Sequence, residues 1–307
     1  LLSCDKDNLS KPPNMPGPGP DPEPEFQPLT DSYGKIAVGR DLGRSRGSPQ
    51  APEELWLANP DWTDLEKIYT TGLGGQSLDD IIQRIKFSPN GDYIAIDEGF
   101  KLTIIDLEGK VKGTAASGNY GETFNWSPNS DGIIFGKYAD GLYKLHADDG
   151  QLERIFKSDD FVYDHRPVFS NDGTKIFFRR DSNDGFYSIL KTNNEGKGVD
   201  SLYTARTGFT DFSLGLIWLD PNFLIFPEPQ GFHWSFNIRL LNTITNDHNL
   251  FRTNFHISDM RPSPNEQTLA LFKGYVFGPG GIFLANLNSI SGDTLEYSRF
   301  RQHDQID

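Results

Sequence analysis

The sequence predicts an all-β fold: a six-bladed β-propeller of four-stranded antiparallel blades, preceded by a disordered, proline-rich N-terminal tether. A phrase that begins Phe87-Ser88-Pro89-Asn90-Gly91 and runs into an apolar stretch recurs along the 307 residues. Its equivalent positions are 39, 43, 49 and 44 residues apart, at Ser88, Ser127, Ser170, Leu219 and Ser263. A period near forty with four short strands per unit is typical of propeller blades.

The composition supports strands and restricts the class of ligand. Aromatic residues make up 13% of the chain, with 23 Phe against 2 Met, which suits half-buried pleated surfaces. The net charge of −14 argues against a nucleic-acid partner, because neutralising phosphates requires clustered Lys and Arg. No stretch approaches the roughly 18 consecutive apolar residues with which a helix spans a bilayer.

The first four residues predict attachment to a membrane. Leu1-Leu2-Ser3-Cys4 resembles the end of a bacterial signal peptide with its lipobox, in which the cysteine is lipidated and becomes the mature N-terminus. The alternative is an incidental cysteine in a tail. Cys4 is the only cysteine, so an intrachain disulfide is excluded. Asp5-Lys6-Asp7, directly after it, resembles the signals that send some bacterial lipoproteins to the cell surface.

Residues 5–28 predict an extended linker. Eight of the 20 prolines lie between residues 11 and 29, and such a composition cannot form a packed core. Two or more acyl chains hold a protein stably on a membrane, whereas one chain does not. A lipid, a spacer and a globular head together predict an outer-membrane lipoprotein of the bacterial cell envelope that faces the periplasm or the cell surface.

Residues 29–301 divide into six units, followed by a C-terminal tail at 302–307. The first unit begins with 29–38 and takes 54–58 as its third strand. The second unit predicts strands at 84–87, 93–97, 102–106 and 111–115. Third strands of later units are predicted at 141–145, 186–190 and 282–286. Pro and Gly in the inner turn favour a tight reversal, and Asn or Asp tolerates its unusual backbone angles.

The phrase Phe/Trp-Ser-Pro-Asn/Asp-Gly, followed by an apolar triplet such as Ile133-Ile134-Phe135, resembles the repeat of the TolB-like β-propellers, a WD-repeat-like bacterial family. The resemblance covers almost everything after residue 30. It is strong in units two to four and partial in the other three. In the fifth unit Leu219 and Asp220 replace the usual Ser-Pro, which predicts a different bend in that blade. The resemblance implies an extracytoplasmic protein that binds another protein or a glycan.

Alternate loops of a four-stranded meander lie on the same side of a propeller. The Ser-Pro-Asn-Gly turns therefore share one face, here called the tight-turn face, with the turns between third and fourth strands. The opposite face collects the segments that lead into each inner strand and the loops between second and third strands. Those loops carry insertions at 41–52, 227–234 and 273–281, so we call this side the inserted-loop face and predict that it binds the ligand.

Candidate ligand-binding residues lie at two places on the inserted-loop face. Residues just before the inner strands should line the channel mouth: Arg84, Glu122, His165, Arg166, Asp211, Asp259 and Arg261. The inserted loops add His233, Trp234, Tyr275 and Phe277. The aromatic residues among them could stack on sugar rings or pack on a protein partner, or else pack within their own hairpins.

The three arginines of this set could converge on an anionic group, for which the geometry of guanidinium is suited. The alternative is that they pair with neighbouring acids around a solvated funnel. The candidate partners are Glu122, Asp164 and Asp259.

No catalytic constellation stands out in the sequence. A Gly-Xaa-Ser-Xaa-Gly nucleophile elbow is absent. We expect no cofactor, although calcium or another divalent ion in the channel stays open, with His165, His233 and His256 as candidate metal ligands. Asp131 and the acidic run at 181–184 could also hold calcium, but neither has the EF-hand loop pattern.

The leading hypothesis is a non-catalytic propeller, tethered to the membrane by an N-terminal lipid, that binds an envelope protein or a cell-envelope glycan and no nucleic acid. The alternative is a lyase or hydrolase that acts on an acidic polysaccharide. Its metal or histidine site at the channel mouth would be built from His165, Arg166 and Arg261.

Overall fold

The computed structural model describes most of the chain from residue 35 onward. The described ranges are 35–40, 53–71, 82–99, 101–116, 124–159, 162–206, 215–219, 222–229, 236–251, 257–262, 268–273, 281–287 and 297–299. The predicted signal-peptide end, the linker and the C-terminal tail lie outside these ranges. Within the described part of the chain, no helix has the length and apolar character needed to cross a bilayer.

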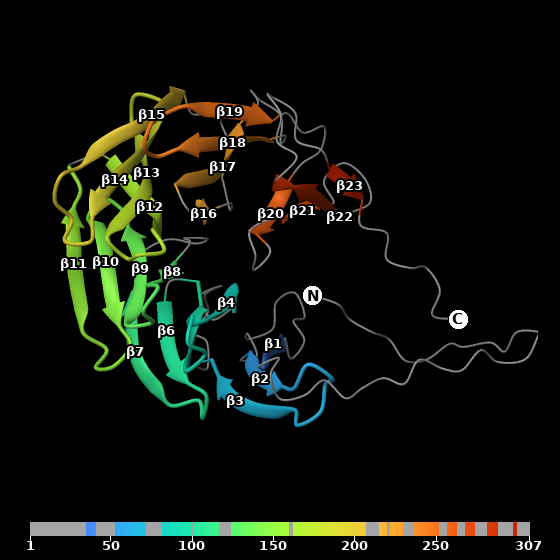
Figure 1. Ribbon diagram of the computed structural model, residues 1–307. Coiled ribbons are helices and arrows are strands. Elements are labelled where there is room, and N and C mark those ends of the chain that lie inside the picture. The colour runs from blue at the N-terminus through green and yellow to red at the C-terminus, as the bar shows by residue number, and fades with distance from the viewer. Residues whose placement is uncertain are drawn as a thin grey trace, which may run out of the picture.

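Six antiparallel sheets are arranged around a central space (Figure 1), which confirms the predicted fold class. Blade one contains β1 (Ile36–Arg40), β2 (Glu54–Ala58) and β3 (Glu66–Thr70). Blade two contains β4 (Arg84–Phe87), β5 (Tyr93–Asp97), β6 (Lys101–Asp106) and β7 (Val111–Ala116). Blade three contains β8 (Asn125–Trp126), β9 (Gly132–Lys137), β10 (Gly141–His146) and β11 (Leu152–Lys157).

The second half of the ring is built in the same way. Blade four contains β12 (Val162–Phe169), β13 (Lys175–Ser182), β14 (Phe186–Asn193) and β15 (Asp200–Arg206). Blade five contains β16 (Ile217–Leu219), β17 (Phe223–Pro229), β18 (Phe236–Asn242) and β19 (His248–Phe251). Blade six contains β20 (Ile257–Pro262), β21 (Thr268–Lys273), β22 (Gly281–Asn286) and β23 (Tyr297–Arg299). The first strand of each of blades two to six is the one nearest the central space (Figure 1).

Two details differ from the expected four-stranded pattern. Blade one has three strands within the described residues, because the segment expected to form its inner strand precedes residue 35. In blade five, residues 227–229 were expected in an inserted loop, but they extend β17 and pair with β18 as far as Pro229 and Phe236. Prolines are tolerated there because the ladder to the short strand β16 has already ended at Ile225, so no bond to that strand is lost.

The recurring phrase builds a turn that closes on itself. The main-chain N–H of Ser88 donates to the oxygen of Tyr93 at 2.9 Å, and its hydroxyl donates to Asn90 Oδ1 at 2.7 Å. Gly91 has a φ of 79°, in the left-handed region that glycine adopts without strain. Ser170 and Asp172 form the equivalent side-chain bond in blade four, at 2.5 Å. The phrase therefore encodes the reversal from the first to the second strand of a blade.

The apolar core lies between consecutive blades. Ile94 and Ile96 of blade two pack with Leu55 of blade one, and Phe135 of blade three packs with Ile104 of blade two. The side chain of Phe135 is fully buried, and burial of a side chain of this size contributes about 1.5–3 kcal/mol. Comparable clusters join blades three and four, four and five, and five and six.

In blades two, three and four, a glycine in the turn between third and fourth strands lets the blade approach the preceding one. A Cβ atom on Gly109 would lie 1.7 Å from the carbonyl oxygen of Ile68, in the outer strand of blade one. A Cβ atom on Gly196 would lie 1.9 Å from the carbonyl oxygen of Ile155, in the outer strand of blade three. Gly150 approaches blade two in the same manner. This close backbone contact was not anticipated from the sequence, although the glycine recurs at that turn.

Candidate functional site

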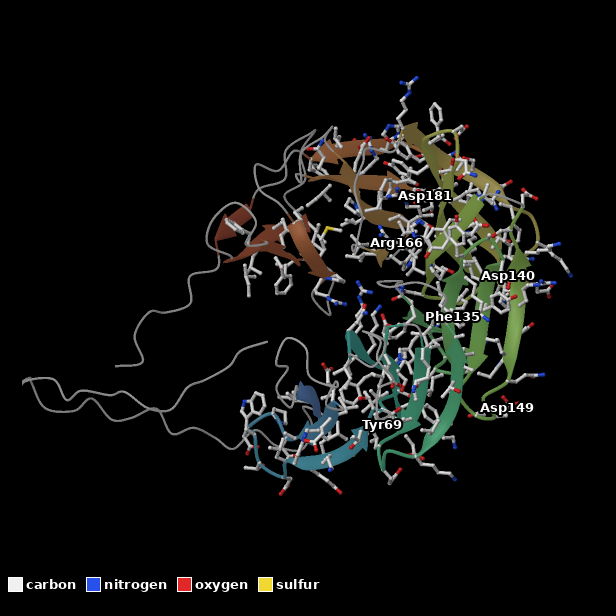
Figure 2. The ribbon with its side chains drawn as sticks, turned by 180° about the vertical axis from the view of Figure 1, so that it is seen from behind. Tyr69, Phe135, Asp140, Asp149, Arg166 and Asp181 are labelled. Atoms are coloured by element: carbon white, nitrogen blue, oxygen red, sulfur yellow. The ribbon has the colours of Figure 1, made fainter. Side chains whose placement is uncertain are left out.

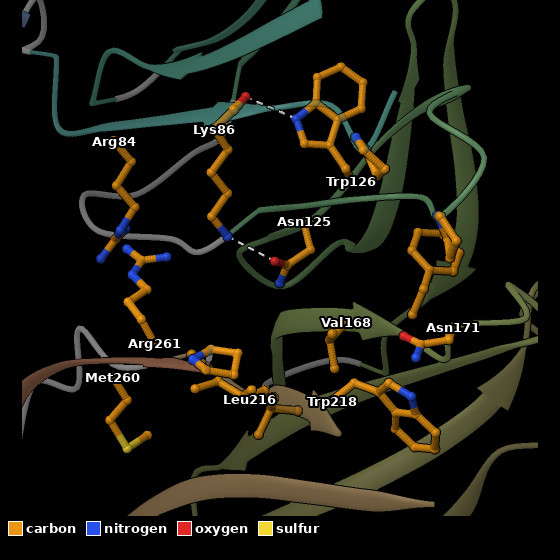
Figure 3. Close-up of a pocket in the computed structure, with 16 residues that line it drawn as sticks. Arg84, Lys86, Asn125, Trp126, Val168, Asn171, Leu216, Trp218, Met260 and Arg261 are labelled. Carbon is orange, nitrogen blue, oxygen red and sulfur yellow. Dashed lines mark hydrogen bonds between the residues drawn. The ribbon is translucent and has the colours of Figure 1, made fainter. Parts of the chain in front are cut away.

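A cavity of about 490 Å³ occupies the centre of the propeller and is the candidate site (Figure 3). Five inner strands line it with the residue that directly precedes the aromatic position of the phrase: Lys86, Asn125, Val168, Ile217 and Arg261. Its size falls in the range of small-molecule and cofactor sites. It extends from Arg84 to Pro89, Pro128 and Asn171 in the tight turns. The cavity therefore continues beyond the inserted-loop face, where sequence reasoning placed the whole site.

Arg84 and Arg261 enter this cavity from blades two and six. Their guanidinium groups point toward one another across the central space (Figure 3). Arg84 opens β4, as expected. Arg261 was expected just before its inner strand, but it lies inside β20 and at the level of Lys86. The long side chain of Arg261 nevertheless brings its charge toward Arg84.

Lys86 and Asn125, which sequence reasoning did not select, line the cavity and connect neighbouring blades through hydrogen bonds. Lys86 Nζ donates to Phe124 O at 2.7 Å and to Asn125 Oδ1 at 2.8 Å, and Asn125 Nδ2 donates to Pro167 O at 2.7 Å. These bonds join blades two, three and four at their inner strands. Lys86 and Asn125 each directly precede the aromatic residue of their phrase, and this sequence position could have identified them. Lys86 is thus held by the scaffold.

Arg166 reaches the same central region from blade four because β12 is bulged. The register of β12 on β13 shifts between His165 and Val168, and Arg166 adopts a φ of 56° within this bulge. Non-glycine residues rarely adopt such a φ, and those that do are held by surrounding structure. Both His165 and Arg166 were expected before the inner strand, but they lie within β12, which starts earlier because the long strand β13 pairs with it from Ser182 onward. Figure 2 shows Arg166 on the inner side of its blade.

Arg166 is buried and lies near charges of both signs. Burial, followed by the positive charge of Arg179, lowers the pKa of Arg166 to about 9, and Arg84 acts in the same direction. The guanidinium therefore still carries its charge at neutral pH. Arg179 and Arg84, from two blades, thus both act on Arg166, while the carboxylate of Asp181 opposes them.

His165 and Arg179 share one carboxylate. His165 Nε2 lies 3.0 Å from Asp181 Oδ2, and Arg179 Nε donates to Asp181 Oδ1 at 2.7 Å. Burial lowers the pKa of His165 to about 3, against the opposing effect of Asp181, so the imidazole is neutral. Burial alone would raise the pKa of Asp181, but the bond from His165 and the charge of Arg179 lower it to about 2.

The alternative expected from the sequence is that the arginines pair with neighbouring acids such as Asp164. The structure shows that Asp164 is bound by Arg180. Both oxygens of this fully buried carboxylate accept hydrogen bonds from Arg180, at 2.7 and 2.8 Å, and one also accepts from the Ser158 hydroxyl. Arg84 lies 3.7 Å from Asp97, a buried carboxylate that sequence reasoning missed. Burial raises the pKa of Asp97 to about 6.

Several predicted site residues lie outside the described part of the chain. These are Cys4, Glu122, Asp211, His233, Trp234, Tyr275 and Phe277. Asp259 lies within β20, and its side chain is not described. The predicted metal site of three histidines also lies partly outside the described residues, because His233 and His256 are not described.

Among the described residues no group of three or more His, Cys, Asp or Glu could hold a metal ion. The carboxylates considered for calcium have other partners. Asp131 accepts from Lys144 Nζ at 2.7 Å, and Asp181 accepts from Arg179. A wider hollow of about 820 Å³ on the tight-turn face, between blades three and four, is lined by charges that pair with each other, such as Lys197 and Glu195 at 2.8 Å. The arginine-lined central cavity is therefore the stronger candidate.

No protein-family model and no curated protein matches the sequence. Solved propellers do match the structure. An oligogalacturonate lyase in complex with manganese aligns with a TM-score of 0.63 at 12% identity, covering 90% of this chain and 76% of that chain. A putative TolB from Agrobacterium tumefaciens aligns with a TM-score of 0.54 at 13% identity, covering 80% and 87%. A putative 6-phosphogluconolactonase from Bacteroides uniformis aligns with a TM-score of 0.57 at 12% identity, covering 89% and 82%.

At these identities the likeness concerns the fold. The chain is a six-bladed β-propeller, and its fold is similar to that of TolB proteins, which confirms the resemblance found in the sequence.

Proposed function

We propose that this chain is a non-catalytic binding propeller of the bacterial cell envelope that holds an anionic group of an envelope protein or glycan at its channel mouth. The observation that carries the proposal is the pair Arg84 and Arg261, whose guanidinium groups point toward one another in one central cavity, with Arg166 close enough to Arg84 for that charge to lower its pKa. The planar fork of a guanidinium suits bidentate binding of carboxylates and phosphates. Arg84 and Arg179 lower the pKa of Arg166 whereas Asp181 raises it, and an anion placed near these arginines would act in the same direction as Asp181.

The parts of the ligand that remain outside the channel would contact the inserted-loop face. We assign this role to His233, Trp234, Tyr275 and Phe277, together with the acids Glu122, Asp211 and Asp259 at the mouth. The aromatic residues supply contact area at a low cost in conformational entropy. Replacing Trp234 and Phe277 by Ala tests this assignment, since it should weaken a polymer more than a single anionic unit.

Membrane attachment through Cys4 completes the proposal. The pattern Leu1-Leu2-Ser3-Cys4 and the proline-rich segment after it support a lipid-anchored protein of the outer membrane, facing the periplasm or the cell surface. In bacterial cells, Cys4→Ser should move the protein from the detergent phase to the aqueous phase in a phase-partition experiment. An unchanged distribution would remove the anchor from the proposal and leave the binding site untouched.

The binding function is tested by calorimetric titration of the full chain with two polyanions, polygalacturonate and polyglutamate. Arg84→Gln and Arg261→Gln should each lower the affinity for the preferred polymer about tenfold, equivalent to about 1.4 kcal/mol of binding free energy. Arg154→Gln, a half-exposed arginine of the outer strand β11, is the matched control and should bind as the wild type does. Equal affinity in all three variants would overturn the proposal, and the preferred polymer identifies the source of the anion.

The fold likeness to oligogalacturonate lyase supplies the second candidate, a lyase or hydrolase on an acidic polysaccharide. His165 would be its base, with Arg166 and Arg261 on the substrate carboxylate. A base with a pKa of about 3 accepts protons poorly at neutral pH. His165 is therefore better suited to a part in ligand binding than to the role of a catalytic base. Release of unsaturated uronate from polygalacturonate, with or without added divalent metal and lost in His165→Ala, would replace the binding function by the lyase.

A further inference from the structure

An exposed tyrosine stands on the inserted-loop face of blade three. Tyr138 occupies the turn between β9 and β10 with 63% of its surface exposed. Its neighbour Ala139 has a φ of 53°, and the N–H of Asp140 donates to Lys137 O at 3.1 Å, which closes the turn. Asp140 is itself held by the Tyr143 hydroxyl at 2.6 Å. The backbone that carries the Tyr138 ring is therefore firmly positioned.

Tyr138 is the outermost of three rings in contact, which lead toward Arg166. Its centroid lies 5.4 Å from that of Tyr163 at the start of β12, with an interplanar angle of 52°. Tyr163 in turn stacks on His165, with centroids 4.2 Å apart and an angle of 13°. The Tyr163 hydroxyl lies close enough to Arg166 to raise its pKa. A series of neighbouring side chains thus leads from an exposed ring to Arg166.

The surroundings of Tyr138 are polar. Ser158 N donates to Asp140 O at 3.3 Å, which places the exposed residues Lys157 and Asp159 next to this turn. A protein interface has an apolar core of several residues, and patches with that role commonly reach a few hundred Å². Among the residues that the structure describes here, a single exposed ring bordered by Lys157 and Asp159 is smaller than such a core. It matches the C–H face of one sugar ring, whose hydroxyls can bond to the charged neighbours.

We propose that Tyr138 and Tyr163 form a rim subsite for one ring of an acidic saccharide, while a carboxylate of the same molecule binds among Arg84, Arg166 and Arg261. This inference rests on the proposed function, which it narrows from an anionic polymer to an acidic glycan. The ring at the rim packs on the exposed face of Tyr138. The bulge at Arg166 and the stack on His165 keep the two parts of the site at a constant separation.

The test compares galacturonic acid with its linear pentasaccharide in calorimetric titrations. Tyr138→Ala should lower the affinity for the pentasaccharide about three- to tenfold, the range expected from the loss of one aromatic contact. The affinity for the monosaccharide should be unchanged. Trp62→Ala is the matched control, because Trp62 is also 63% exposed but lies between β2 and β3, on the tight-turn face. It should bind both ligands as the wild type does. Tyr138→Phe keeps the ring and should retain pentasaccharide binding.

The outcomes separate the two proposals. If Tyr138→Ala binds the pentasaccharide as tightly as the wild type does, the rim subsite is overturned, while a loss in Arg261→Gln keeps the anion site. If a pentaglutamate peptide binds more tightly than the pentasaccharide and depends on Tyr138, the partner is a protein and the saccharide assignment is wrong. If Arg84→Gln and Arg261→Gln bind every probe normally, the proposed function itself fails.

Discussion

The indole N–H of Trp126 donates a hydrogen bond to the main-chain oxygen of Lys86, 3.0 Å away, and so joins the inner strands of two neighbouring blades. Trp218 occupies the equivalent position in blade five. Its indole nitrogen is buried and has no acceptor among the described residues, although its ring stacks on Phe177 at 4.8 Å. The same residue type at the same place in the repeat thus has different roles in blades three and five.

This difference predicts unequal costs for two identical substitutions. Trp126→Phe removes the donor and leaves the oxygen of Lys86 without this bond, so the free energy of unfolding should fall by about 1–2 kcal/mol beyond the loss of ring volume. Trp218→Phe removes a buried donor that has no acceptor among the described residues, so the loss of the N–H itself should cost nothing. Urea unfolding monitored by circular dichroism measures both. Equal losses in the two variants would contradict the assignment.

The close approach between blades predicts a second pair of unequal substitutions. Gly109 and Gly185 have almost the same φ, 80° and 82°, so an alanine suffers the same backbone strain at each. A Cβ atom at Gly185 meets nothing within 4 Å, whereas one at Gly109 would collide with Ile68 O. Gly185→Ala should therefore cost about 1 kcal/mol, and Gly109→Ala should cost a further 1–3 kcal/mol, roughly the penalty of overpacking. Thermal and urea unfolding compare the two, and equal midpoints would show that strain alone limits this position.

The strands were predictable because the phrase determines both the turn and the register around it. In blade two the predicted β4 and β5 have the observed bounds, and β6 and β7 differ by one residue at one end. Blade five departed from the expectation where Pro227 and Pro229 continue a strand. Proline favours a loop locally, and only the early end of the neighbouring strand β16 makes it acceptable there. That information is tertiary and is not present in the local sequence.

The site was predictable as a set of charges but not as an arrangement. Reasoning that inner-strand residues share a mouth selected Arg84 and Arg261, which line the same cavity, and Arg166, whose pKa Arg84 lowers. Strand register and packing between blades determine three features that the sequence does not reveal. These are the bulge at Arg166, the pairing of Asp164 with Arg180, and the exposure of Tyr138. Sequence periodicity places residues on a face, but it does not select partners among several nearby charges.

The buried carboxylate of Asp97 predicts a pH dependence of stability. Its pKa of about 6 in the folded protein lies above the value of about 3.9 in an unfolded chain. Between these values the folded state holds a proton that the unfolded state has lost, so the free energy of unfolding falls as the pH rises from about 4 to about 6. Two pKa units correspond to on the order of 3 kcal/mol.

Asp97→Asn stays neutral and should lack this contribution. The difference in unfolding free energy between Asp97→Asn and the wild type should therefore shift in favour of the variant as the pH rises from about 4 to about 6, with the change centred midway between the unfolded and folded pKa values of Asp97, at about pH 5. The amide side chain of the variant would retain an oxygen that can accept from Gly99 N, a bond of 3.0 Å in the wild type. Parallel urea titrations across this pH range measure the difference, and a constant difference would show that Asp97 titrates normally.

A hydrogen bond between blades four and five predicts a measurable coupling. The Tyr203 hydroxyl donates to Glu228 Oε1 at 2.8 Å, and Arg239 Nε donates to the other oxygen at 2.6 Å. Burial, followed by the bond to Glu228, raises the pKa of Tyr203 to about 12. In a double-mutant cycle of Tyr203→Phe and Glu228→Gln, the coupling energy should be about 1–2 kcal/mol, since the bond is charge-assisted and partly buried.

The chain supplies a matched control for this cycle. Tyr93 donates to Asp148 Oδ1 across the boundary of blades two and three, but at 3.3 Å and in an exposed position. Solvent competes for both groups there, so the coupling between Tyr93→Phe and Asp148→Asn should be less than half as large. Chemical unfolding of the wild type, the single variants and the two double variants yields both energies. A coupling at the exposed pair equal to that at Tyr203 and Glu228 would mean that burial does not strengthen the contact between blades four and five.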